Sequence, residues 1–345
     1  MFQILQQRRL CLHALLFVTS WTSVSYAASA ADTISSPSCC VTLPRSCDSI
    51  WLVSTRAFPC GDPRLHVNQL SYHVLDENNE WQPSNLDAFL ATDDPAVTTI
   101  FWAHGNRSNR QQAVSEGMGT YRGIARCSTC DTPMRFVIFS WPADRTGSQL
   151  EDIRIKAQRT DPNGYYLAWL VDQISPEVQI SLIGYSYGAR ITAAALHLLG
   201  GGSINCWALT DRVHPNRPPL HVVLVAAAFD NHWLIPGHHY GNALSQVAHM
   251  TIIYNPCDRV LKRYRYVYCR RSKAQALGYT GFAGLGRLSA VDRAKICQIN
   301  SSPYMGKSHD VNDSITVGAI NAALRNECLP RKSVGLASKK AKRAA

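Results

Sequence analysis

The sequence predicts an α/β protein with a doubly wound, mostly parallel β-sheet. The chain has 345 residues, of which 46% are hydrophobic. It can therefore bury a large core, and it is neither disordered nor fibrous. Short apolar runs without polar alternation recur along the chain, as in strands that are buried on both faces. Helical patterns separate these runs, and such an alternation is typical of a parallel sheet.

Each expected element follows from its local composition. Strands are expected where apolar, β-branched and aromatic residues run together, at 50–54, 66–76, 98–103, 136–140, 179–183, 221–228, 250–254 and 294–299. Helices are expected at 111–126, 163–174, 189–199 and 314–328. Asp161 and Pro162 indicate the start of the second helix, because proline is favoured in a first helical turn. Gly200 ends the third helix.

The ends of the chain differ from this body. Residues 1–30 have the pattern of a secretory signal peptide: a basic start, a short apolar stretch, and the small-residue site Ala28-Ser29-Ala30. Ala31 would then begin a secreted or periplasmic protein. An uncleaved membrane anchor is the alternative, although the apolar run is short for a span. We expect residues 31–48 to form an extended, Cys-rich leader and residues 49–330 to form the folded domain. Residues 331–345 are expected to be a basic disordered tail.

The positive charge is concentrated rather than spread. The formal net charge is +11, but Arg8, Arg9 and the tail hold much of the excess. A nucleic-acid partner is therefore not predicted, and the tail suggests only a weak attraction to anionic surfaces. The basic aromatic stretch 262–271 predicts a cap or helix beside an active site. The alternatives for this stretch are base stacking, an anionic substrate or an envelope surface.

The cysteines indicate an oxidising compartment. There are 12, of which Cys11 lies in the signal peptide. Cys127 and Cys130 form a C-x-x-C pair without a second such pair or a suitably spaced His, so a local disulfide is predicted rather than zinc. A further cluster is expected to pin the mature N-terminus and comprises Cys39, Cys40, Cys47 and Cys60. We predict no metal and no cofactor, since no glycine-rich phosphate loop follows a strand.

A catalytic serine is predicted at the turn Gly184-Tyr185-Ser186-Tyr187-Gly188. This G-x-S-x-G pattern lies between an expected strand and an expected helix, where it forms a sharp turn that projects the serine at the carboxyl edge of the sheet. The following helix directs its amides to the same place. Ser186 is therefore the candidate nucleophile.

A serine nucleophile needs a base and an acid that orients the base. His309 lies after the last expected strand and is the candidate base. Asp258, one strand earlier, is the candidate acid, and Asp230 is the alternative. The oxyanion hole needs two N–H donors. We expect them from Tyr187 and from Asn106, which follows His104-Gly105 at a strand end.

Together, these motifs resemble a bacterial family of secreted or uncharacterised α/β-hydrolases of esterase/lipase type. The resemblance rests on the strand ends His104–Asn106 and Ser140–Pro142, on Gly184–Gly188, on His309, and on a first strand ending at Ser54-Thr55-Arg56. It covers roughly residues 50–328 and implies the α/β-hydrolase fold. There are two departures. Tyr185 and Tyr187 stand where the family has a His-Ser-Met-Gly-type turn, and Asn106 replaces the usual aromatic residue.

The function expected from these residues is a secreted serine hydrolase that cleaves a small-molecule ester through an acyl-enzyme. A non-catalytic binding protein with the same fold is the alternative. The substrate depends on the segments 144–165 and 259–293, whose shapes the sequence does not reveal.

Overall fold

The computed structural model describes residues 44–58, 61–126, 128, 130–268 and 274–310. The signal peptide, most of the leader, the helix expected at 314–328 and the basic tail lie outside the described residues.

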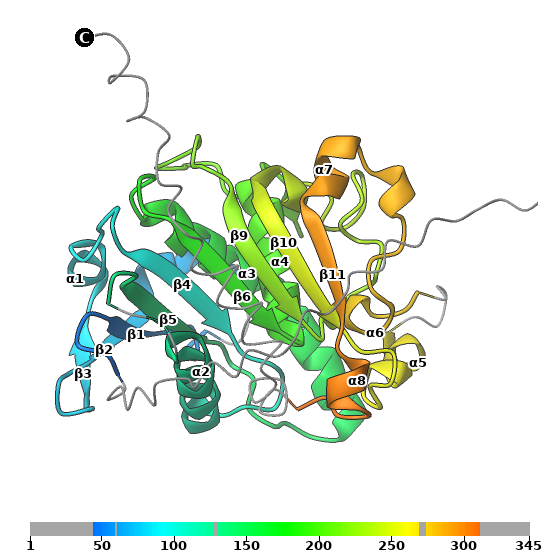
Figure 1. The fold of residues 1–345 in the computed structure, drawn as a ribbon, viewed down its shortest axis with the longest axis horizontal. Helices are drawn as coiled ribbons and strands as arrows, with labels where there is room; N and C mark the ends of the chain where they lie inside the picture. The colour runs from blue at the N-terminus through cyan, green and yellow to red at the C-terminus, as the bar shows by residue number, and fades with distance from the viewer. Residues whose placement is uncertain (1–43, 59–60, 127, 129, 269–273, 311–345) are drawn as a thin grey trace, which may run out of the picture. The chain divides into compact units, whose positions relative to one another are not determined.

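Nine strands of the described chain form one twisted sheet (Figure 1). Their order is β11-β10-β9-β6-β4-β5-β1-β2-β3, and β2 runs antiparallel to the other eight strands. The bounds are β1 Ser49–Ser54, β2 Ser71–Leu75, β3 Trp81–Ser84, β4 Thr98–Ala103, β5 Met134–Ser140, β6 Ile180–Tyr185, β9 Leu220–Val225, β10 Val247–Tyr254 and β11 Ile296–Asn300. The predicted α/β class with a mostly parallel sheet is confirmed.

Helices cover both faces of the sheet. They are α1 Leu86–Leu90, α2 Arg110–Ala125, α3 Gln149–Gln173, α4 Tyr187–Leu199, α5 Tyr264–Tyr268, α6 Leu277–Thr280, α7 Ala290–Ala294 and α8 Ser302–Met305. Short 3₁₀ turns include η1 Pro63–Leu65, η2 Val67–Gln69, η3 Ala243–Gln246, η4 Leu261–Arg263 and η5 Leu285–Arg287, and β7 Ser203–Ile204 pairs with β8 Trp207–Ala208.

Alternate side chains of the central strands point to opposite faces of the sheet. On β4, Phe101 and Ala103 belong to the core shared with α3 and α4, whereas Ile100 and Trp102 belong to the core shared with α2. Because both faces are covered, the strands are apolar throughout rather than alternating.

The second helix begins much earlier than the predicted range 163–174. It runs over Gln149–Gln173, with Pro162 in its interior. Proline removes one helical hydrogen bond, and the Asn163 side chain donates to the nearby Arg159 carbonyl at 2.7 Å. Gly164 lets the helix approach Ala194 of α4 closely. Burial against α4 thus outweighs the local preference of proline for a first turn.

The strand predicted at 66–76 is only partly correct. The turn η1 directly precedes the predicted range, its first residues form η2, and β2 begins at Ser71. Asp62 caps η1 by accepting a hydrogen bond from the Arg64 N–H, and Pro63 starts the turn. This capped start competes with an extended conformation and delays the strand.

The predicted local disulfide is wrong, because Cys130 is bonded to Cys47. Residues just before β1 dock on the segment after α2, where Asp48 accepts a hydrogen bond from the Met134 N–H at 2.9 Å. This docking brings two cysteines 83 residues apart into contact. Cys206, Cys257 and Cys297 are exposed free thiols, while Cys39, Cys40, Cys60 and Cys127 lie outside the described residues.

Candidate active site

The strands β4, β6, β10 and β11 end at one edge of the sheet, because they run parallel. The strand order changes direction between β4 and β6: the chain continues from β4 to β5 on one side and then crosses to β6 on the other. Ligands of open α/β sheets bind at such switch points. Asn106 follows β4 and Ser186 follows β6, so both lie at this point.

Ser186 occupies a strained turn between β6 and α4. Its backbone has φ 53° and ψ −112°, a conformation that residues other than glycine rarely adopt. The Ser186 N–H donates to the Val225 carbonyl at 2.9 Å, which anchors the turn to β9. Gly188 is needed because a Cβ there would collide with the Ala103 carbonyl, and a Cβ on Gly184 would lie 2.5 Å from the Ala189 Cα.

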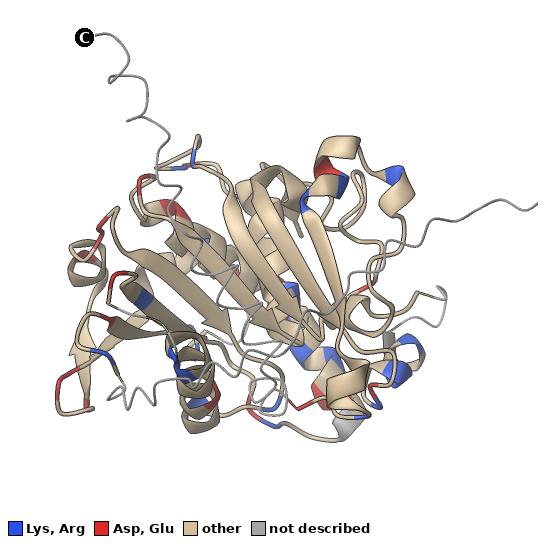
Figure 2. Cartoon of the chain, in the orientation of Figure 1, with Lys and Arg blue, Asp and Glu red and all other residues tan. Residues whose placement is uncertain are grey.

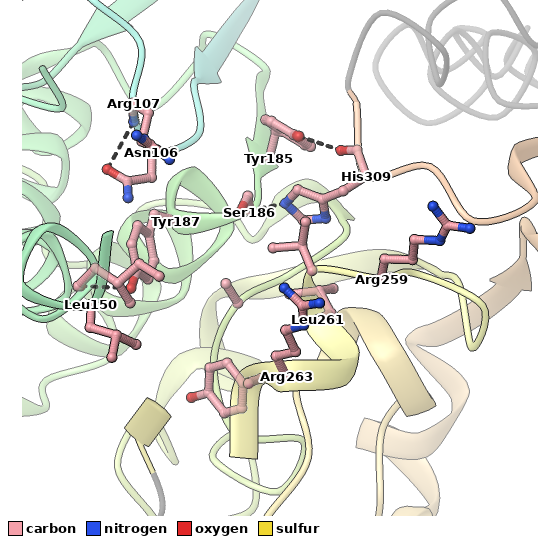
Figure 3. A pocket seen from close by; sticks show the side chains of 14 residues that line it. Asn106, Arg107, Leu150, Tyr185, Ser186, Tyr187, Arg259, Leu261, Arg263 and His309 are labelled. Atoms are coloured by element: carbon pink, nitrogen blue, oxygen red, sulfur yellow. Dashed lines mark hydrogen bonds between the residues drawn. The ribbon is translucent and has the colours of Figure 1, made fainter. Parts of the chain in front are cut away.

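The structure brings Ser186, His309 and Asp258 together. Figure 3 shows the Ser186 side chain beside the His309 ring. The His309 Nε2 lies 3.2 Å from the Ser186 Oγ, and its Nδ1 lies 2.5 Å from the Asp258 Oδ2. The other oxygen of the buried Asp258 accepts from the Val260 and Leu261 N–H groups at 2.8 and 2.9 Å. The carboxylate is thereby fixed with one oxygen turned to the imidazole.

The alternative acid, Asp230, is engaged elsewhere. Its Oδ1 accepts a hydrogen bond from the Tyr264 hydroxyl at 2.7 Å. Asp258, rather than Asp230, is the carboxylate in contact with His309.

Two side chains that the sequence did not suggest hold the His309 loop. The Asn255 Nδ2 donates to the Gly306 and Ser308 carbonyls at 3.0 and 3.2 Å, while its Oδ1 accepts from the Cys257 N–H. The Tyr185 hydroxyl donates to the His309 carbonyl. Their only sequence signals were an Asn at a strand end, where side chains often form turns, and the departure from the family pattern before the serine.

The two expected oxyanion residues flank the serine. Tyr187 is the first residue of α4, whose N-terminus favours negative charge, and Asn106 lines the same cavity. The Asn106 side chain is fixed: its Oδ1 accepts from the Arg107 N–H at 2.8 Å, and its Nδ2 donates to Asp152 at 3.2 Å. The Tyr187 hydroxyl donates to the Ile153 carbonyl, which ties α4 to the first turns of α3.

Three of the strand-end motifs form one network below the Asn106 loop. His104 is fully buried, and its Nε2 accepts from the Trp141 N–H at 3.2 Å. Burial and the charge of Arg56 lower the pKa of His104 to about 3, so the ring is neutral. Arg56 donates to the Ser140 Oγ at 2.7 Å and to the Ser108 carbonyl at 2.9 Å. His104 therefore supports the loop structurally.

A cavity of about 470 Å³ opens in front of Ser186. The start of α3 forms one wall, and η4 with the start of α5 forms the other (Figure 3). The described part of the basic aromatic stretch therefore lies beside the site, as expected. The lining residues are Asn106, Arg107, Leu150, Ile153, Tyr185, Ser186, Tyr187, Ala228, Arg259, Val260, Leu261, Arg263, Tyr264 and His309.

Within the described ranges, no group of three or more His, Cys, Asp or Glu residues is arranged to hold a metal ion. Within the same ranges, no helix has the length and apolarity needed to cross a membrane.

No protein-family model matches the sequence, and a comparison with curated proteins gives no match. Solved structures with a similar fold exist. The catalytic core domain of acetyl xylan esterase from Trichoderma reesei is 14% identical, with 68% of this chain and 97% of that chain covered and a TM-score of 0.35. A second structure, of an acetylxylan esterase, is 16% identical, with 68% of this chain and 95% of that chain covered and a TM-score of 0.32.

A cutinase-like protein from Cryptococcus sp. is 14% identical, with 68% of this chain and 98% of that chain covered and a TM-score of 0.30.

Proposed function

We propose that the protein is a serine hydrolase that cleaves esters through an acyl-enzyme intermediate. One observation carries the proposal: the hydrogen-bonded chain Ser186–His309–Asp258, with distances of 3.2 and 2.5 Å, opens into a cavity beside a strained serine turn. A nucleophile, a base in contact with it and an acid orienting the base are the parts that acyl transfer requires.

The reaction follows from the roles of these atoms. The Ser186 Oγ attacks the ester carbonyl carbon while the His309 Nε2 accepts its proton, and Asp258 stabilises the resulting imidazolium. The main-chain N–H groups of Tyr187 and Asn106 are proposed to bind the oxyanion. The C–O bond to the alcohol then breaks, and the alcohol takes the proton from His309. Water attacks the acyl-enzyme by the same route, which releases the acid and restores Ser186.

We also propose that the protein is exported and that the chain from 49 to 330 is one hydrolase domain. The disulfide between Cys47 and Cys130 supports an oxidising compartment, as does the signal-peptide pattern of residues 1–30. Finding full-length chain only in a membrane fraction, with Met1 retained, would instead support the uncleaved anchor.

Fluorophosphonate labelling combined with hydrolysis of a 4-nitrophenyl ester series tests the proposed activity. We expect the probe to label Ser186, and we expect Ser186→Ala to abolish labelling and lower kcat by roughly a thousandfold or more. Ser115→Ala, an exposed serine of α2, is the matched control and keeps full activity. Absence of labelling and of turnover in a folded wild-type protein would favour the non-catalytic binding protein.

A further inference from the structure

The cavity in front of Ser186 is positively charged. The lining residues that the structure describes include Arg107, Arg259 and Arg263 and contain no Asp or Glu. Lys and Arg gather around α5, near the carboxyl edge of the sheet (Figure 2). The site therefore presents guanidinium groups to whatever enters it.

These charges are only partly neutralised by the protein. The Arg107 Nε lies 3.9 Å from Asp152, but that carboxylate also pairs with Lys156 at 3.1 Å, so the trio keeps one positive charge. Arg259 and Arg263 are exposed, and neither forms an ion pair with a carboxylate of the described residues. Guanidinium donors match the oxygens of carboxylate and phosphate groups.

The arginines lie on two sides of the reacting serine. Figure 3 shows Ser186 between Asn106 and Arg107 on one side and Arg259, Leu261 and Arg263 on the other. Arg259 and Arg263 closely follow the acid Asp258 in the chain, whereas Arg107 follows the Asn106 loop. The remaining walls are largely apolar, with Leu150, Ile153 and Val260 among them.

We infer that the preferred substrate is an ester that carries an anionic group, a carboxylate or a phosphate, near the scissile bond. This inference rests on the proposed hydrolase function. The apolar walls bind the carbon skeleton, and the arginines attract the anion, which a neutral ester of the same size does not offer. Because the arginines are partly solvated, salt should weaken the preference.

Two matched ester pairs test the inference. In the acyl pair, 4-nitrophenyl hydrogen adipate is compared with its neutral methyl ester. In the alcohol pair, 4-carboxyphenyl acetate is compared with 4-carbamoylphenyl acetate. We expect kcat/KM to be at least about tenfold higher for the anionic member of one pair at low salt, and the ratio to fall at 0.5 M NaCl. The pair that shows the preference identifies which part of the substrate carries the anion.

Variants assign the preference to the cavity. Arg263→Gln and Arg259→Gln should each lower the anionic-to-neutral ratio severalfold. Lys262→Gln is the matched control, because this substitution also removes one positive charge from the same segment. Lys262 is exposed and does not line the cavity. An equal loss of the ratio in Lys262→Gln would overturn the assignment, since general surface charge would then explain it.

The two proposals fail in different ways. Hydrolysis of neutral esters with labelled Ser186, but without an anionic preference in either pair, overturns the inference and leaves the hydrolase intact. A folded protein that neither hydrolyses any of the four esters nor reacts with the fluorophosphonate overturns both.

Discussion

The Ser186 turn and the His309 loop meet at a hydrogen-bond distance of 3.2 Å, yet they are held by different kinds of contact. The serine turn is fixed by main-chain bonds to β9 and by glycines that allow close backbone approach. The His309 loop follows β11 and the short helix α8, and the side chains of Asn255, Tyr185 and Asp258 tie it to the sheet edge.

Because of this difference, the serine turn matters most for the stability of the fold, and the contacts of the loop matter most for the alignment of the His309 imidazole. Backbone at the serine turn is part of the core, so a change there disturbs the whole fold. Side-chain bonds to the loop each contribute little to the free energy of unfolding, but together they set where the imidazole lies. We therefore expect a side chain added at a glycine of the turn to destabilise the fold, and mutations around the loop to lower kcat in a folded protein.

Gly188→Ala should have the largest effect. Its Cβ would collide with the Ala103 carbonyl, a main-chain atom of the central sheet that cannot move aside. We expect a loss of about 3 kcal/mol or more in the free energy of unfolding, measured by urea denaturation. Gly286→Ala is the control, because a Cβ there meets nothing within 4 Å. Equal stability of the two variants would show that the turn is not rigid.

Asp258→Asn should have the second largest effect. Circular dichroism should show that the variant is folded. The amide neither holds the required His309 tautomer nor stabilises the imidazolium, so kcat should fall by roughly a thousandfold or more. Asp230→Asn is the comparison, since Asp230 bonds the Tyr264 hydroxyl and should affect turnover much less. The reverse order of the two variants would transfer the role of the acid to Asp230.

Asn255→Ala should have an intermediate effect. It removes both bonds from the side chain to the Gly306 and Ser308 carbonyls, so the imidazole loses its alignment. A cost of about 1–3 kcal/mol in the activation free energy corresponds to a roughly fivefold to 160-fold lower kcat. Slower fluorophosphonate labelling without denaturant, where circular dichroism shows the variant to be fully folded, is the readout that distinguishes positioning from general destabilisation.

Asn231→Ala provides the control for that variant. The Asn231 side chain bonds the Thr280 hydroxyl, away from the His309 loop, and its loss should leave labelling unchanged. If both variants label at the wild-type rate, Asn255 does not position the base.

Tyr185→Phe should have the smallest effect. The variant loses the hydroxyl bond to the His309 carbonyl but keeps the ring, whose centroid lies 5.5 Å from that of the imidazole. A single hydrogen bond at a partly buried site predicts a severalfold fall in kcat. Tyr185→Leu should cost more, because the ring contact goes as well. A loss as large as that of Asp258→Asn would mean that this hydroxyl alone aligns the loop.

The sequence by itself determined the class of the fold and the identity of the three residues that meet. Apolar runs fixed where β4, β6 and β10 lie, because a strand buried on both faces needs apolar residues throughout. The expected order of serine, acid and base along the chain then predicted that Ser186, Asp258 and His309 meet, since parallel strands deliver their ends to one edge.

Only the tertiary structure decided the features that depend on contacts between distant segments. Cys130 pairs with Cys47, and α3 continues through Pro162, because docking and helix packing outweighed the local signals. The hydrogen bonds from Asn255 to the His309 loop depend on such contacts, and so does the placement of the arginines around the cavity. Such side chains are ordinary in the sequence, and their roles come from the segments that the fold places beside them.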